Sequence, residues 1–327
     1  MRVLVTGGAG YIGSHAVREL RDAGHSVTVL DDLSAGRRAA VPRDVAFVHG
    51  DLADPTAQSR ALEGVDAVMH FAGLLSVAGS VREPLRYHQH NVGKGLTLLG
   101  AMAERGVRRM IFSSTCATYG MPVRVPIDED HPQAPINPYG RSKLAFEGAL
   151  RDLASAGQVR AVALRYFNAA GCHPDGSLGE DHQPEEHLIP LAIDAALGRR
   201  GGLVVNGEDY DTPDGTCIRD YIHVQDLARA HVRALEALET GAPFRAFNLG
   251  TAKGHSVREV LRSVEKVGGR KIPMSVGPRR PGDPPRLVAA ADRIREELGF
   301  QPKVLELDAI VESAWRWRVA HPQGYAA

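Results

Sequence analysis

The chain has 327 residues, of which 43% are hydrophobic and 24% charged, as is usual for a soluble globular protein that forms one large domain or two smaller ones. Its 39 Lys and Arg residues balance 39 Asp and Glu residues, which argues against a general affinity for nucleic acid or anionic membranes. The N-terminal apolar run is too short for a signal peptide, no stretch reaches the roughly 18 apolar residues of a membrane span, and the three cysteines lie far apart, so we expect a reduced cytoplasmic protein.

Short β-branched runs alternate with helical patterns through the first half of the chain. The predicted strands cover residues 2–6, 26–30, 45–49, 66–72, 108–114 and 159–167. The predicted helices run from Tyr11 to just before Gly24 and over 83–105 and 138–156. This alternation predicts an α/β fold, a Rossmann-type doubly wound parallel sheet with helices on both faces.

The second half of the chain is less regular. Helices are predicted over 224–238 and 256–267 and a strand over 244–250, whereas the proline-rich segment 278–286 must be a loop. We predict a nucleotide-binding Rossmann domain over 1–167, to which 218–250 returns. A smaller α/β substrate-binding domain is predicted from 168–217 and 251–327.

A glycine pattern directly follows the first predicted strand. Gly7, Gly10 and Gly13 permit a tight turn, close approach of a pyrophosphate to the backbone, and a helix N-terminus that faces the anion. Asp31 ends the second strand, 18 positions beyond Gly13, where a carboxylate binds ribose hydroxyls and repels a 2′-phosphate. NAD is therefore favoured over NADP, although Arg37 and Arg38 nearby leave NADP open. The alternative is a tight turn without a ligand.

A tyrosine and a lysine lie four residues apart on a predicted helix. Tyr139 and Lys143 therefore share one helix face. A phenol with a pKa of about 10 is a poor base at pH 7, but an adjacent ammonium and a cationic nicotinamide ring would lower that pKa. Thr115, at the end of a predicted strand, could bridge a substrate and Tyr139. The alternatives are an exposed helix face and a routine strand-end hydroxyl.

Segments throughout the chain carry a family resemblance. They are GGAGYIGSH (7–15), DDLSAG (31–36), GDLAD (50–54), FAGL (71–74), SSTCATYG (113–120), NPYGRSK (137–143), RYFNAAG (165–171), DGTCIRDYIHVQDLA (214–228), NLGT (248–251), RRPGD (279–283) and HPQGY (321–325). The sequence resembles the extended short-chain dehydrogenase/reductase family and, within it, the nucleotide-sugar epimerases. The glycine and Tyr/Lys motifs mark the superfamily, whereas RYFN, RDYIHV and RRPGD are more specific to the epimerases.

The resemblance implies an isomerase of carbohydrate metabolism that acts on a UDP-sugar and keeps NAD bound. It implies reversible oxidation at C4 through a 4-keto sugar, which interconverts UDP-galactose and UDP-glucose while the cofactor carries the hydride chemistry. It also implies a homodimer formed through helices near 83–105 and 138–156.

The family's site residues carry over to matching positions of this sequence. The implied catalytic residues are Thr115, Tyr139 and Lys143. The implied cofactor-binding residues are Gly7, Gly10, Tyr11, Ile12, Gly13, Asp31, Asp32, Asp51, Leu52, Phe71, Ala72, Gly73, Asn91, Ser113, Tyr139, Lys143 and Tyr166. The implied substrate-binding residues are Thr115, Tyr139, Asn168, His187, Leu188, Arg219, Arg280, Asp283 and Leu287, with the two arginines on the diphosphate.

Several positions depart from the family pattern. Leu75 stands where relatives often carry a lysine, and His187 where some carry an asparagine that faces the diphosphate. Asn206 stands where an aromatic residue often lies near the uracil, which leaves TDP open. His182 and His187 flank a carboxylate pair, but the loop context and the lack of a third nearby ligand predict no metal there.

Other activities within the fold stay open at this point. Leu287 is implied beside the C2 substituent of the sugar, so UDP-N-acetylglucosamine is a weaker expected substrate, and an epimerase of UDP-glucuronate is a further alternative. A 4,6-dehydratase usually carries an Asp-Glu pair after the threonine. Here Cys116 and Ala117 follow Thr115, which argues against a dehydratase. A non-catalytic sensor is disfavoured by the intact set of Thr115, Tyr139 and Lys143.

Overall fold

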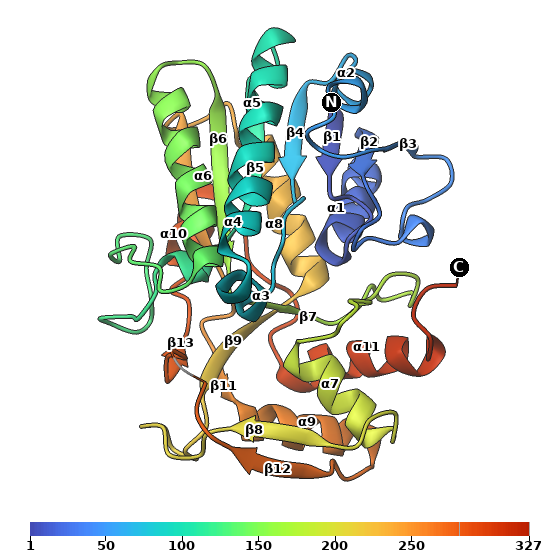
Figure 1. The fold of residues 1–327 in the computed structure, drawn as a ribbon, viewed down its shortest axis with the longest axis vertical. Helices are drawn as coiled ribbons and strands as arrows, with labels where there is room; N and C mark the ends of the chain where they lie inside the picture. Colours follow the sequence, from blue (N-terminus) through green and yellow to red (C-terminus); the bar gives the residue numbers. More distant parts are fainter. Residues whose placement is uncertain (281, 327) are drawn as a thin grey trace.

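A computed structural model describes residues 1–280 and 282–326, and its larger part is a seven-stranded parallel sheet (Figure 1). In spatial order the strands are β10 (Phe244–Leu249), β6 (Arg160–Tyr166), β5 (Arg109–Thr115), β4 (Ala67–His70), β1 (Arg2–Thr6), β2 (Ser26–Asp31) and β3 (Ala46–His49). All seven were predicted, and the doubly wound sheet is confirmed. The strand order reverses between β1 and β4, which is where open α/β sheets bind ligands.

Helices cover both faces of the large sheet. Successive strand side chains point to opposite faces, so Val3 and Val5 of β1 join one apolar core whereas Leu4 joins another. The first core includes α1 (Tyr11–Asp22), α8 (Val224–Glu236) and α10 (Asp292–Leu298). The second includes α2 (Pro55–Ala61), α5 (Gly95–Glu104) and α6 (Pro138–Ser155). Burial on both faces explains why these strands are nearly continuous apolar runs.

The helix predicted over 83–105 is not one regular helix. It consists of α4 (Pro84–His88), a π-helical segment η2 (Gln89–Lys94) and α5, and α3 (Val77–Arg82) precedes it. The wider turn carries Asn91 and Lys94, whose side chains bond to Leu74 and Asp51. Apolar periodicity does not record such polar contacts, and π-turns are frequent at functional sites.

A smaller part of the fold lies below the large sheet in Figure 1. Its strands are β7 (Asn168–Ala170), β9 (Ile218–His223), β11 (Gly254–Ser256) and β13 (Arg286–Leu287), with β8 (Leu203–Asn206) and β12 (Met274–Gly277) forming a separate parallel pair. A third core packs α7 (Leu188–Ala196), α9 (Val257–Gly268) and α11 (Leu307–Ala320) together. Short 3-10 turns are η1 (Arg38–Ala40) and η3 (Cys116–Thr118).

The chain passes between the two parts more than once. Residues 218–223 form β9 in the smaller sheet, whereas α8 and β10 return to the large one, and α10 packs there as well. The predicted loop 278–286 connects β12 to β13, except that Arg286 already belongs to β13 and Pro281 lies outside the described residues. Within the described residues, every helix is too short or too polar to cross a membrane.

Candidate active site

The glycine turn connects β1 to α1 and packs against the residues that follow β4. Gly7 has a φ of +71°, and a Cβ there would lie 2.5 Å from the Ala72 nitrogen. A Cβ at Gly13 would lie 2.2 Å from the Gly7 oxygen, so the helix and turn also pack too closely for a side chain. At Gly10, which caps α1, a Cβ would meet only the Gly7 oxygen, at 3.3 Å. The space over the N-terminus of α1 therefore fits a pyrophosphate.

The carboxylate of Asp31 lies beside this turn. Its two oxygens accept backbone hydrogen bonds from Ala9 and Leu33, each at 2.9 Å. Burial raises the pKa of Asp31, and these two hydrogen bonds oppose that effect. Each oxygen retains a second lone pair for a ribose hydroxyl. The two nearby arginines are engaged elsewhere, since Arg37 pairs with Asp181 at 3.0 Å and Arg38 donates to the Val41 oxygen at 2.7 Å. This arrangement favours NAD over NADP.

Three further residues of the predicted cofactor-binding set, Asp32, Asp51 and Leu52, follow strands β2 and β3. Asp32 accepts from the Ser34 backbone at 2.9 Å, and Asp51 forms an ion pair with Lys94. Leu52 is buried in the second core. Lys94, which was not among the predicted residues, thus holds Asp51 at this edge of the sheet.

The segment after β4 is held by Asn91. The Asn91 amide accepts from the Leu74 nitrogen at 2.8 Å and donates to the Leu74 oxygen and the Ser142 hydroxyl, both at 3.0 Å. A side chain at Gly73 would lie 3.3 Å from Asn91 Oδ1 and 3.4 Å from Lys143 Nζ. Gly73 thus lies against α6, whereas Phe71 packs against the His231 ring of α8, with ring centroids 4.7 Å apart, and Ala72 packs against the second core.

Tyr11 and Ile12, two of the predicted cofactor-binding residues, are the first two residues of α1 and hold this helix in place. The Tyr11 hydroxyl donates to the Gly171 oxygen at 2.7 Å, which ties the helix to the segment after β7. Ile12 packs against the first apolar core. Both contacts fix the helix whose N-terminus faces the proposed pyrophosphate.

The predicted catalytic residues meet at the carboxyl end of β5. Asn137 caps α6 through its 2.8 Å hydrogen bond from the Gly140 nitrogen, so Tyr139 and Lys143 occupy the first turns of the helix. Lys143 Nζ donates to the Ser113 oxygen at 3.0 Å. Thr115 is buried, and its hydroxyl, which accepts from the Ala117 nitrogen at 3.1 Å, is near enough to Tyr139 to lower the pKa of the phenol.

Burial dominates the pKa values of the pair. It raises the pKa of Tyr139 well above its usual value, and the hydrogen bond with Thr115 only partly opposes this. It lowers the pKa of Lys143 to about 8, against the effect of the Glu147 carboxylate. Without the cofactor the pKa of Tyr139 is thus raised, whereas the expected lowering requires both the ammonium and the cationic nicotinamide ring and stays a prediction.

Ser113 and Tyr166 complete this end of the sheet. Their hydroxyl oxygens lie 2.9 Å apart, across the pairing of β5 with β6.

Cys116, which follows Thr115, is buried, and burial raises its pKa to about 12. A thiol with that pKa does not replace the carboxylate pair of a dehydratase.

Sequence reasoning missed a buried ion pair next to these residues. Glu147 and Arg165 have side chains that are 0% and 2% exposed, and Arg165 donates to both carboxylate oxygens. Arg165 also donates to the Tyr119 hydroxyl at 2.9 Å. The signals were an acidic residue on the Tyr139/Lys143 face of α6 and an arginine inside an apolar strand.

Predicted substrate residues gather around β9 and the loop before β13. Arg219 pairs with Asp283, and Asn168 donates to the Asp220 oxygen at 2.9 Å. With its amide oxygen facing Arg280, Asn206 accepts hydrogen bonds at 3.1 and 3.2 Å. The two arginines thus have carboxylate or amide partners that can orient them toward a diphosphate.

Leu287 and Leu188 also lie at this side of the fold. Leu287 of β13 is paired with Arg219 and packs against the cluster that contains Cys116 and Phe167. Leu188 is the first residue of α7 and packs against the third core. Leu75, where relatives often carry a lysine, is an exposed apolar side chain.

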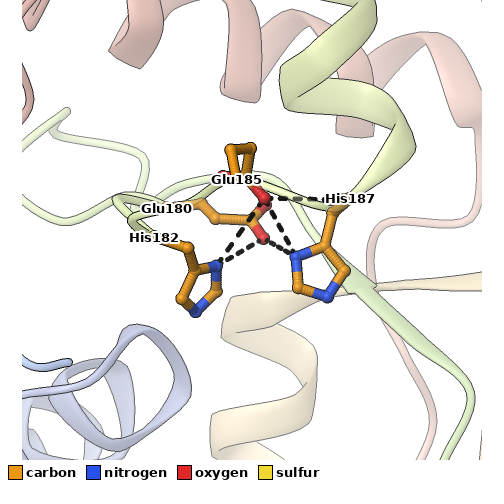
Figure 2. A group of neighbouring side chains, drawn as sticks. All are labelled: Glu180, His182, Glu185 and His187. Carbon is orange, nitrogen blue, oxygen red and sulfur yellow. Dashed lines mark hydrogen bonds and ion pairs between the residues drawn. The ribbon is translucent and has the colours of Figure 1, made fainter. Parts of the chain in front are cut away.

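The segment before α7 brings four potential ligands together (Figure 2). Glu180, His182, Glu185 and His187 each offer an atom within 4.8 Å of those of the others. The expected lack of a third nearby ligand is therefore wrong, because the loop folds back on itself. Burial alone would lower the pKa of His182, but the hydrogen bonds that its ring donates to the Glu180 and Glu185 carboxylates outweigh burial and raise the pKa to about 9.

Comparisons with known proteins agree over nearly the whole chain. A sequence model of the NAD dependent epimerase/dehydratase family matches residues 3–250. A curated UDP-glucose 4-epimerase of Azospirillum brasilense is 54% identical over 318 residues, covering 97% of this chain and 91% of that protein. The crystal structure of UDP-glucose 4-epimerase from Brucella ovis in complex with NAD has a TM-score of 0.93 and 49% identity, covering 96% and 97% of the two chains. The Bifidobacterium longum enzyme in complex with NAD⁺ and UDP has a TM-score of 0.94 and 38% identity, covering 99% and 100%.

Proposed function

The chain belongs to the NAD dependent epimerase/dehydratase family, and on that premise we propose that it interconverts UDP-galactose and UDP-glucose by reversible oxidation at C4 of the sugar. The single observation that carries this proposal is the meeting of Tyr139, Lys143 and Thr115 at the carboxyl end of β5, opposite Gly73. This is the edge of the sheet at which the glycine turn presents the N-terminus of α1.

The residues of the chain have separate tasks in the proposed reaction. Bound NAD supplies hydride acceptance and return. Tyr139 takes the proton of the C4 hydroxyl, and the Thr115 hydroxyl orders the phenol and the sugar oxygen. Lys143, fixed by Ser113, provides the positive charge beside them. Arg219 and Arg280 hold the diphosphate, so the 4-keto sugar can turn while UDP stays bound.

An assay without added cofactor tests this function directly. The purified protein is expected to convert UDP-galactose to UDP-glucose at full rate without added NAD, because the redox cycle returns its hydride to the sugar. Acid denaturation should release NAD(H) in about equal amount to the chain. Strict dependence on added NAD, with no released dinucleotide, would contradict tight cofactor retention, and the absence of UDP-glucose would contradict the function itself.

The second prediction concerns sugar size and Leu287. Leucine is smaller than tyrosine, so the proposed pocket beside Cys116 leaves space at C2, and UDP-N-acetylglucosamine is expected to be a weaker substrate. Replacing Leu287 by tyrosine should reduce kcat/KM for the acetylated sugar about 10–200-fold relative to UDP-galactose. Leu287→Met, which nearly conserves volume, is the matched control. An unchanged ratio in Leu287→Tyr would show that this residue does not select the sugar.

We also propose a homodimer formed through the helices around α5 and α6. Leu85 of α4 and Leu96 of α5 are exposed apolar residues on this side of the chain, 69% and 47% exposed. Light scattering should give twice the chain mass of 35.2 kDa. Leu96→Arg should shift it toward the single-chain mass, whereas Met121→Arg, at an exposed apolar site in a loop, should not. A wild-type monomer at micromolar concentration would contradict the proposal.

The free thiols of Cys116, Cys172 and Cys217 support a proposed location in the reducing cytoplasm.

A further inference from the structure

The segment from residue 180 to residue 187 forms a compact set of metal-ligand side chains outside the proposed reaction. Figure 2 shows the carboxylates of Glu180 and Glu185 between the two imidazole rings, with the outer ring nitrogens pointing away from them. His187 Nδ1 lies 2.7 Å from Glu180 Oε1 and 3.2 Å from Glu185 Oε1. His182 Nδ1 lies 3.2 Å from Glu180 Oε1 and 3.9 Å from Glu185 Oε1. These four residues are called the Glu/His cluster below.

We infer that the Glu/His cluster binds one Zn²⁺ ion through Nδ1 of His182 and His187 and one carboxylate oxygen each of Glu180 and Glu185. Ligands at about 2.0–2.2 Å from a tetrahedral zinc ion lie about 3.3–3.6 Å from one another. The observed separations scatter around the lower end of that range. The shortest separation would have to widen by roughly 0.6–0.9 Å and the longest to close by roughly 0.3–0.6 Å, which side-chain rotations can supply.

The donor set and its burial also fit zinc. Imidazole nitrogen with carboxylate oxygen in a four-coordinate set suits Zn²⁺, whereas Mg²⁺ and Ca²⁺ prefer six or more oxygen ligands. Two carboxylates balance the charge of the ion, which a buried site requires. The Glu185 side chain is only 9% exposed: its Oε1 faces the two histidines, and its other oxygen, Oε2, is buried without a hydrogen-bond partner among the described residues. Such an unpartnered carboxylate oxygen is costly unless it binds a cation.

A closed set of four protein ligands gives the ion a structural task. The cluster fixes a segment that contacts the nucleotide-binding part, because the His182 ring packs edge-on against Tyr11 at 6.0 Å and Asp181 pairs with Arg37. At its other end, His187 caps α7. A metal-bound histidine usually donates its outer nitrogen to a second partner, which leaves His187 Nε2 for an anion such as the proposed diphosphate. Zinc binding itself does not depend on the proposed function.

Metal titration of the full-length protein tests the site. Chelator-treated protein is titrated with ZnSO₄ and then freed of excess metal, and zinc per chain is measured by mass spectrometry. One equivalent is expected, with a rise in Tm that MgCl₂ does not reproduce. His182→Gln and Glu185→Gln should each weaken zinc binding about tenfold or more. The two variants remove different ligand types, and circular dichroism verifies that each one folds.

The neighbouring chain offers matched controls. Glu186 is adjacent to Glu185 but accepts from the Ser76 hydroxyl at 2.6 Å, and His173 pairs with Asp175 outside the cluster. Glu186→Gln and His173→Gln should retain one equivalent of zinc. Wild-type protein that binds no zinc and shows no change in Tm would overturn the proposal and leave two histidine–carboxylate ion pairs in its place. Folded cluster variants that bind zinc as tightly as wild type would overturn it as well.

Discussion

Replacing Tyr139 by phenylalanine is expected to lower kcat about 10²–10⁴-fold, the usual cost of losing a positioned general base. The buried ring keeps its shape, so packing at the start of α6 and the hydrogen bond from Lys143 to Ser113 should survive. The predicted contacts with UDP lie mainly on Arg219, Arg280 and Asp283. The Kd for UDP, measured by calorimetry, should therefore change less than about threefold.

The two measurements separate chemistry from binding. A kcat within about threefold of wild type would remove Tyr139 from proton transfer. A large loss of UDP affinity together with kcat would instead indicate a disturbed site. Thr115→Val is a useful companion, because it removes the hydroxyl that helps to lower the pKa of Tyr139 while nearly keeping the side-chain volume. Its kcat should fall by a smaller factor than that of Tyr139→Phe.

The pKa shifts explain why Lys143 alone does not make Tyr139 a base at neutral pH. Burial raises the pKa of Tyr139 and lowers that of Lys143 to about 8, so the protein alone holds a protonated phenol at neutral pH. A further positive charge in the same desolvated space is required to favour the phenolate. A cationic nicotinamide ring has that charge, which couples proton removal to the presence of the oxidised cofactor.

Local patterns in the sequence predicted the large sheet and the turn that its ligand needs. The runs from β1 to β6 are largely apolar, those of β1 and β2 are rich in β-branched residues, and Gly7 and Gly13 of the first turn have backbone contacts too close for a side chain. The four-residue spacing of Tyr139 and Lys143 placed both on one face of α6. Each of these inferences depends on residues that are close in sequence or on a fixed period.

Features that depend on polar side-chain contacts rather than on apolar periodicity escaped prediction. The π-turn in η2 accompanies bonds from Asn91 to Leu74 and from Lys94 to Asp51, which span 17 and 43 positions. The Glu/His cluster forms because the loop before α7 folds back, although its ligands span only eight residues. The residues of that loop show neither helical nor strand periodicity, so spacing alone gave no indication of the meeting.

Replacing Glu147 by alanine is expected to lower the free energy of unfolding by about 3–5 kcal/mol, because it leaves Arg165 buried without its counter-charge. Ser114 also loses the acceptor of its hydroxyl. Urea denaturation followed by circular dichroism measures the loss. The double variant Glu147→Met/Arg165→Met should recover much of it, since well-packed apolar side chains often replace a buried ion pair at little cost. A loss below about 1 kcal/mol in the single variant would show that the pair contributes little.

The conservative variant Glu147→Gln separates this structural contribution from an effect on catalysis. Glutamine keeps the size of the side chain and an acceptor for Arg165, but it removes the negative charge that raises the pKa of Lys143. That pKa, already lowered by burial to about 8, should fall further, so less of Lys143 is charged at pH 7.5. The alkaline limb of the kcat profile should then move to lower pH, with little change in activity at pH 6. If the limb stays in place while stability falls, Glu147 supports the fold without tuning the lysine.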